Sequence, residues 1–217
     1  PSRPGESDLR LSPGEQIVDT AAVSETERPL HRPTIAAVIL AAGGGTRFEG
    51  ESHKLLAPFK GRPVVSWAID AALGAGFDEV YVITGAVDLG DVVPDGVVLV
   101  ENHSWEDGQA TSLRTAVAVA EADGHDAIVV GLGDMPMVPS EAWRLVAEAE
   151  GDLVTATFSG RRSPPVKIGE ELWSLLPLSG DEGARSVIRL RPDLVEEVAC
   201  PGQAVDIDTR GDLSRWS

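Results

Sequence analysis

The sequence has one cysteine, one tyrosine, and 18 lysine and arginine residues against 35 aspartate and glutamate residues. Because Cys200 is the single cysteine, no internal disulfide can form, which favours a reducing compartment. The formal net charge of −17 argues against nucleic acid as a partner, since nucleic-acid binding needs clustered basic side chains. No apolar run approaches the roughly 20 residues that span a bilayer, and the N-terminal end shows no signal-peptide pattern. We therefore expect a cytoplasmic protein that binds neither nucleic acid nor a membrane.

The 217 residues, of which 42% are hydrophobic, are enough for one substantial core. Residues 1–33 are rich in proline, serine, glutamate and glycine and have only scattered apolar positions. Such a segment buries too little surface to offset its ordering entropy, so we expect a disordered or loosely attached tail. Residues 34–217 are expected to form a single domain.

Short apolar runs rich in β-branched residues alternate with segments of helical periodicity. The predicted strands are 35–40, 80–84, 97–100, 127–130 and 153–156, and the predicted helices are 64–73, 108–120 and 140–149, the last capped by Ser140. Beyond residue 160 the pattern weakens, and we expect helices over 170–176 and 182–190 and strands over 194–199 and 204–207. The alternation predicts a three-layer α/β/α sandwich with a mostly parallel, Rossmann-like sheet.

Three successive glycines, Gly43 to Gly45, follow the predicted strand 35–40. Glycine allows positive φ freely and lets an anion approach the backbone N–H groups closely. Arg47 and Lys54 add two cations beside this turn. The stretch predicts a phosphate site, with a plain tight turn as the alternative. It is not a P-loop, because no Gly-Lys-Ser/Thr follows, and its glycine spacing does not fit the dinucleotide fingerprint.

Acidic residues occur at two further places where a parallel sheet would bring ligands together. Asp134 follows the strand 127–130, where a carboxylate could hold Mg²⁺ against phosphate oxygens; the alternative is a turn cap. Asp206 and Asp208 alternate along an expected strand, so both carboxylates can point to one side. Two carboxylates at such a short separation repel each other unless a cation lies between them. The alternative is that Asp208 caps the following turn.

Together these motifs resemble the nucleotidyltransferases with the glycosyltransferase-A-like (GT-A-like) fold. Leu40-Ala41-Ala42-Gly43, Arg47 and Lys54-Leu55-Leu56 resemble their signature loop, and Gly133-Asp134-Met135-Pro136 resembles their metal-binding Gly-Asp-x-Pro. Asp206-Ile207-Asp208-Thr209, continued by Asp212-Leu213, is similar to their Asp-x-Asp-Thr-x-x-Asp-Leu. Gly108 to Leu113 resembles a base-holding segment, with Gln109 in place of the usual methionine; read from chemistry alone, it is a helix start capped by Thr111 and Ser112.

Gly180 to Arg185 resembles an acceptor-side segment of one branch, the molybdenum cofactor cytidylyltransferases and their MobA-like relatives. This resemblance implies transfer of CMP from CTP to a phosphorylated, molybdopterin-type acceptor, with Mg²⁺ as cofactor and pyrophosphate as the leaving group. A molybdenum hydroxylase or its maturation factor is an implied protein partner. Two alternatives stay open. The segment Gly-Gly-Gly-Thr-Arg also resembles the loop of the sugar-phosphate nucleotidyltransferases, and the chain could instead be a non-catalytic nucleotide- or cofactor-binding partner of such a hydroxylase.

The resemblance also assigns residues to roles. Arg47 and Lys54 are the implied catalytic residues, Asp134 with Asp208 or Asp206 the metal ligands, and Arg185 the acceptor contact. The implied nucleotide-binding residues are Leu40, Ala41, Ala42, Gly43, Gly44, Gly45, Thr46, Asn102, Gly108 and Ser112. Trp105 is expected in the core, and His53, His103 and His125 are assigned no role because they lack metal-ligand spacing.

Overall fold

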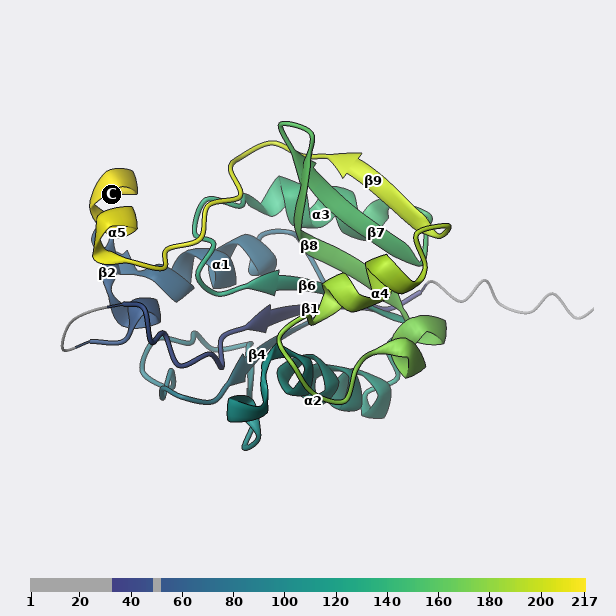
Figure 1. Cartoon of the computed structure of the whole chain (residues 1–217), viewed down its shortest axis with the longest axis horizontal. Helices are drawn as coiled ribbons and strands as arrows, with labels where there is room; N and C mark the ends of the chain where they lie inside the picture. The colour runs from purple at the N-terminus through teal and green to yellow at the C-terminus, as the bar shows by residue number, and fades with distance from the viewer. Residues whose placement is uncertain (1–32, 49–51) are drawn as a thin grey trace, which may run out of the picture. The chain divides into compact units, whose positions relative to one another are not determined.

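A computed structural model describes residues 33–48 and 52–217 (Figure 1). The predicted tail, residues 1–33, lies outside these residues except for Pro33, so it stays a prediction. In the described part of the chain, no helix is long and apolar enough to cross a membrane.

One sheet of seven strands, in the order β5-β4-β1-β6-β8-β7-β9, organises residues 33–217 as far as they are described. The strands are β1 (Ile35–Leu40), β4 (Glu79–Thr84), β5 (Val98–Glu101), β6 (Ala127–Leu132), β7 (Leu153–Phe158), β8 (Arg161–Gly169) and β9 (Val195–Ala199). Neighbouring strands pair in parallel, except that β8 runs antiparallel to both β6 and β7. Because β1 and β6 are buried along nearly their whole length, their sequences are continuous apolar runs rather than alternating ones.

Helices cover both faces of the sheet (Figure 1). On one face α1 (Val64–Leu73) and α3 (Ser140–Glu148) pack on inward residues of β1, β4, β6 and β7. On the other face lie α2 (Gln109–Ala122), α4 (Ala184–Leu190) and the 3-10 helix η3 (Glu170–Leu175). Alternate residues of β1 enter the two cores, Ala37 and Ile39 on one side and Ala36 and Val38 on the other, as the strand period of two requires. The predicted three-layer fold with a mostly parallel sheet is confirmed.

Shorter elements surround the carboxyl ends of β1 and β6, whose arrowheads point the same way in Figure 1. They are the 3-10 helices η1 (Lys54–Leu56) and η2 (Trp105–Asp107), the hairpin of β2 (Pro58–Phe59) and β3 (Arg62–Pro63), and the terminal helix α5 (Arg210–Trp216). A small separate core holds the hairpin, α1 and the segment before α5 together through Phe59, Val64 and the fully buried Ile207.

One strand was missed and two predictions of local structure are wrong. Strand β8 was not predicted, because Pro164 and Pro165 within it hide the apolar pattern of a strand. Residues 204–207 are not a strand, since the N–H of Ile207 donates to the Asp134 carbonyl instead of to a sheet neighbour (2.9 Å). Ser140 does not cap α3: it is the first residue of the helix, and Pro139, whose backbone is extended as is usual before a helix, occupies the N-cap position.

Candidate active site

A cleft of about 320 Å³ lies at the carboxyl ends of β1 and β6. Its walls come from the glycine loop after β1, from η1, from the start of α2 and from the turn after β6. Of the residues predicted to form the site, those that line it are Leu40, Ala41, Ala42, Gly43, Gly44, Lys54, Gly108, Ser112 and Asp134. The remaining predicted residues, which do not line this cleft, are Gly45, Thr46, Arg47, Asn102, Arg185, Asp206 and Asp208.

Lys54 lies between two of the predicted metal ligands. Its Nζ is 2.6 Å from Oδ2 of Asp134 and 2.8 Å from Oδ1 of Asp208. These three side chains are mostly buried, at 13%, 17% and 25% exposure respectively. Burial by itself lowers the pKa of the Lys54 ammonium, but the charges and hydrogen bonds of Asp134 and Asp208 outweigh burial and hold that pKa above its usual value. Arg47, exposed to solvent, adds a second cation, with Nη2 3.1 Å from Oδ2 of Asp208.

Negative charge is in excess at this place. Asp206 is exposed at the surface, but the partial desolvation of its carboxyl group, followed by repulsion from Asp134 and Asp208, raises its pKa to about 6, against weaker opposing effects of Lys54 and Arg185. Asp134 Oδ1 is buried and has no hydrogen-bond partner in the described structure. Among residues 33–48 and 52–217, no three His, Cys, Asp or Glu side chains are already arranged around a common ion position. A buried, unpartnered carboxylate oxygen beside two further carboxylates nevertheless fits a hard divalent cation such as Mg²⁺ or Mn²⁺.

Hydrogen bonds between residues distant in the sequence hold Asp134 and Asp208 close together beside Lys54. The turn after β6 is tied to β1 by the Gly133 N–H, which donates to the Leu40 carbonyl (2.9 Å). Ile207 then donates to the Asp134 carbonyl, and its buried side chain anchors the segment before α5. Thr209, not Asp208, caps α5, in a capping box with Asp212. The alternative assignment of Asp208 as a cap is therefore wrong. Its carboxylate instead forms ion pairs with Lys54 and Arg47.

This geometry separates the role of Asp208 from that of its neighbour. Thr209→Ala removes the cap of α5 and is expected to lower the free energy of unfolding by about 1 kcal/mol. Because the Asp208 carboxylate stays in place, turnover should change little. Thermal denaturation and nucleotidyl-transfer assays on Thr209→Ala check this; a loss of turnover as large as that of Asp208→Ala would mean that the cap itself controls the site.

Asn102 is buried behind Ser112, a residue that lines the cleft, and bonds it. It is 4% exposed, and its Nδ2 donates to Ser112 Oγ and Thr111 Oγ1, both at 2.9 Å. Its Oδ1 accepts from the Ser104 N–H (3.0 Å). Asn102 thus holds Ser112, which does line the cleft, to the loop that begins after β5.

Trp105 and His53 were not recognised from the sequence. Trp105 is half-buried and lines the cleft instead of lying in the core, with its ring against Gly44, where a Cβ would come within 3.1 Å of it. His53 lies behind the glycine loop, with Nε2 3.0 Å from the Gly43 carbonyl oxygen. Neither contact has a local sequence signal, because each joins residues from separate turns.

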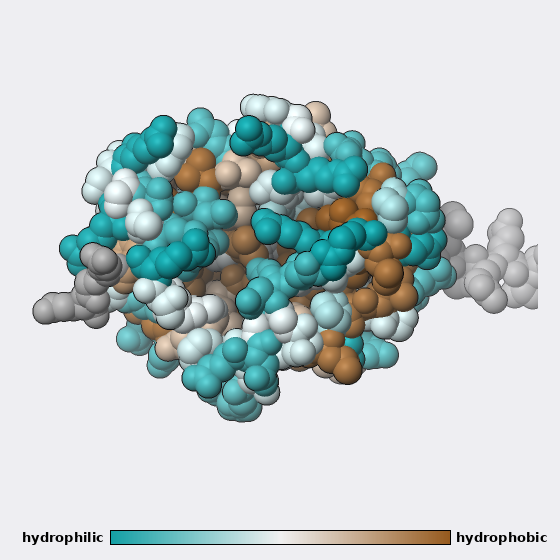
Figure 2. Space-filling model, viewed as in Figure 1, coloured by the Kyte–Doolittle hydropathy of each residue, from teal (hydrophilic) through white to brown (hydrophobic). Residues whose placement is uncertain are grey.

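A second pocket of about 260 Å³ adjoins the cleft and shares Leu40, Gln109 and Leu132 with it. Its other walls are largely apolar, from β6, β8 and α4, and three charged residues, Arg162, Glu182 and Arg185, also line it. Figure 2 shows apolar residues between the hydrophilic side chains in the middle of this face. Arg185, the predicted acceptor contact, therefore lines the second pocket, which adjoins the cleft.

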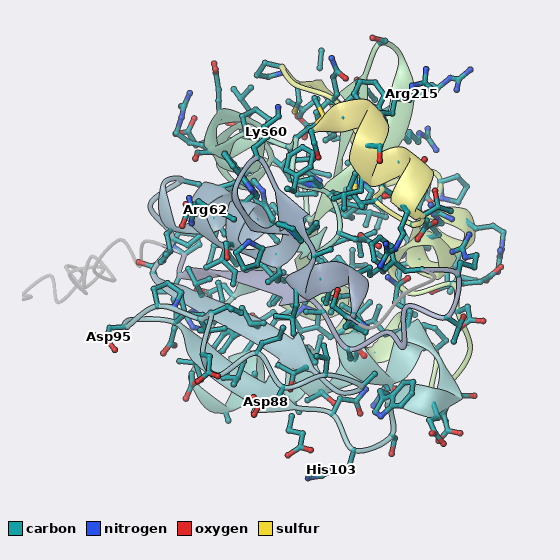
Figure 3. The ribbon with its side chains drawn as sticks, turned by 90° about the vertical axis from the view of Figure 1, so that its left-hand side faces the viewer. Lys60, Arg62, Asp88, Asp95, His103 and Arg215 are labelled. Carbon is teal, nitrogen blue, oxygen red and sulfur yellow. The ribbon has the colours of Figure 1, made fainter. Side chains whose placement is uncertain are left out.

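Figure 3 views the molecule from the side to which the β1 and β6 arrowheads point. Lys60 and Arg62, beside the β2–β3 turn, and Arg215 on α5 lie in the upper half of this view. Asp88, Asp95 and His103 lie in the lower half. Lys60, Arg62 and Arg215 thus lie on the side of the β2–β3 hairpin and α5, and Asp88 and Asp95 on the opposite side.

The chain belongs to the MobA-like NTP transferase family, because the model of the MobA-like NTP transferase domain matches residues 37–198. Nicotine blue oxidoreductase of Paenarthrobacter nicotinovorans is 32% identical over 82% of this chain and 93% of its own length. The purine catabolism protein PucB of Bacillus subtilis is 30% identical over 83% of this chain and 94% of its own. The bifunctional protein GlmU of Cutibacterium acnes is 34% identical over 52% of this chain and 28% of its own.

Solved structures agree with this family. Rv0371c from Mycobacterium tuberculosis is 28% identical, with a TM-score of 0.72 over 84% of this chain and 97% of that one. A structure of Rv0371c in complex with manganese has a TM-score of 0.69 and 27% identity, covering 84% of this chain and 97% of that one. The mixed, mostly parallel sheet flanked by helices is the GT-A-like nucleotidyltransferase fold, and family and fold together support nucleotidyl transfer as the chemistry of this protein.

Proposed function

We propose that the protein transfers CMP from CTP to a phosphorylated acceptor of the molybdopterin class and releases pyrophosphate. The observation that carries the proposal is the juxtaposition of the glycine loop with Lys54 and Asp134 in one cleft, where Asp208 bonds Lys54 from outside the lining, beside a second pocket that contains Arg185. A triphosphate fits the cleft, because it meets the backbone N–H groups of the glycine loop and the Lys54 ammonium there, and Arg47 lies nearby, bonded to Asp208. A flat, apolar ring system with an anionic group fits the second pocket.

The reaction needs no protein nucleophile. An oxygen of the acceptor phosphate attacks the α-phosphorus of CTP in line, that P–O bond forms, and the bond to the pyrophosphate oxygen breaks. Lys54 and Arg47 donate to the phosphate oxygens and stabilise the charge that develops on the α-phosphate and the leaving pyrophosphate. Ser112, held by Asn102, offers a hydroxyl to the pyrimidine. Asp134, with Asp208 or Asp206, would hold a divalent cation, which supplies charge neutralisation when bound.

Nucleotide binding should depend on a divalent cation, since three carboxylates face a site with two cations. Calorimetric titration with CTP is expected to give an affinity at least tenfold higher with Mg²⁺ or Mn²⁺ than with EDTA. Equal affinity in both conditions would mean that these carboxylates do not form a metal site. Magnesium alone, titrated without nucleotide, is the control.

Pyrophosphate release tests the function directly. The purified chain is incubated with each of the four NTPs and either molybdopterin, a sugar 1-phosphate or no acceptor. We expect release with CTP and molybdopterin. A preference for the sugar 1-phosphate would favour the second candidate, to which the partial match with GlmU points.

Two further outcomes would also contradict the proposal. Tight NTP binding without any pyrophosphate release would indicate a nucleotide-binding partner of a hydroxylase rather than an enzyme. Oxidation of NADPH in place of NTP turnover would indicate redox chemistry of the kind in the name of the nicotine blue relative.

A further inference from the structure

Both ring nitrogens of His53 are engaged by the backbone. Nδ1 lies 3.3 Å from the Leu55 N–H at the start of η1, and Nε2 lies 3.0 Å from the Gly43 carbonyl oxygen. Since the Leu55 N–H can only donate, Nδ1 accepts and carries no proton. Nε2 therefore carries the proton of the neutral ring and donates it to Gly43. Burial and the neighbouring Lys54 charge lower the pKa of His53, against the opposing effect of the Gly43 hydrogen bond, which favours this neutral form.

The hydrogen bond to Gly43 sets the direction of the next N–H group. The peptide between Gly43 and Gly44 is trans, so its carbonyl and its N–H point in opposite directions. With the carbonyl facing His53, the N–H of Gly44 faces away from His53. Gly43 and Gly44 line the cleft, whereas His53 does not. Within the described residues the Gly44 N–H has no hydrogen-bond partner, so it is available to an anion in the cleft.

Little else in the loop fixes this peptide. A Cβ at Gly43 would meet nothing within 4 Å, and glycine has the widest choice of backbone conformations. Gly45, at φ +60°, lies against the imidazole, where a Cβ would come within 3.0 Å of Nε2. The ring of His53 thus both supports the loop and, through Leu55, joins it to the turn that carries Lys54.

We infer that His53 is a positioning residue: it holds the Gly43–Gly44 peptide with its N–H toward the triphosphate and fixes the loop relative to Lys54. This inference rests on the proposed binding of a nucleotide in this cleft. Without His53 the Gly43 carbonyl loses its hydrogen bond and the peptide gains rotational freedom, which binding must then restrict. A triphosphate consequently binds more weakly, although every group that touches it is still present.

Two substitutions distinguish the hydrogen bond from His53 to Gly43 from the capping of η1 by His53. In His53→Asn the side-chain oxygen still accepts from the Leu55 N–H, but the side chain is too short to reach Gly43. In His53→Gln the terminal amide extends about as far as Nε2 and can donate to the Gly43 carbonyl. Calorimetry with CTP and Mg²⁺ is expected to show about tenfold weaker binding for His53→Asn, and binding within about twofold of wild type for His53→Gln.

An amide resonance supplies a second readout. Pyrophosphate with Mg²⁺ should shift the Gly44 ¹H–¹⁵N signal of the wild-type protein strongly and that of His53→Asn weakly. Equal CTP affinities for the wild type and His53→Asn, or losses that merely follow a lowered melting temperature in both variants, would overturn the inference and leave the proposed function standing. A wild-type protein that binds no NTP would refute the proposed function, and the inference with it.

Discussion

Asp134→Ala is expected to lower turnover about 10³-fold while the protein stays folded. Asp134 lies in the turn after the central strand β6, bonds Lys54 through Oδ2, and has a buried Oδ1 without a partner in the described structure. Its replacement removes one of the two carboxylates that position Lys54, and the less exposed of the two. Single-turnover rates and a thermal denaturation curve check the two halves of this expectation. Near-wild-type turnover would refute the assignment of Asp134 as a metal ligand.

Asp208 and Asp206 provide the matched comparison. If Asp208 and Asp134 share one cation, the double mutant should be little slower than the slower single mutant, because the second change removes a ligand from a site already broken. Asp206→Ala tests whether the third carboxylate binds the cation or only adds negative charge. A small effect for Asp206→Ala beside a large one for Asp208→Ala would assign the second ligand to Asp208.

Lys54→Met is expected to lower turnover by about 10²- to 10³-fold, since it removes the ammonium that would stabilise the developing phosphate charge. The same change should also destabilise the protein in EDTA by about 3 kcal/mol, because Asp134 and Asp208 would then lie mostly buried without the Lys54 ammonium between them, and Arg47 contacts only Asp208. The turnover loss and the stability loss have one origin, the position of Lys54 Nζ between two carboxylates.

A divalent cation separates these two effects. Mg²⁺ or Mn²⁺ can replace the lost positive charge, so either ion should raise the melting temperature of Lys54→Met more than that of the wild type. Turnover should not recover. Lys60→Met, the same substitution on an exposed lysine beside the β2–β3 turn, is the control and should change neither quantity. A Lys54→Met protein with unchanged stability in EDTA would show that the two carboxylates do not depend on Lys54.

The central elements were predictable because their signals are local. The apolar run Ile35–Leu40 and the helix Val64–Leu73 have the predicted bounds, since strand burial and helical spacing are written in a few consecutive residues. Strand β8 and the segment 204–207 were not predictable in the same way. β8 exists as a strand because β6 and β7 pair with it on both sides, which no local pattern encodes.

For the candidate site, too, local features were predictable and tertiary contacts were not. The sequence alone indicated which residue types follow each strand, and the family resemblance assigned roles to Arg47, Lys54, Asp134 and Asp208; those roles remain predictions. What only the tertiary structure decided is how these groups meet. Lys54 bonds Asp134, 80 positions away, and Asp208, 154 positions away, because the carboxyl ends of β1 and β6 share one edge and Ile207 anchors the C-terminal segment there. A motif sets which groups each turn carries, whereas hydrogen bonds between turns that are distant in the sequence set how far apart those groups lie. The packing of Trp105 against Gly44 is likewise a tertiary contact that no motif encodes.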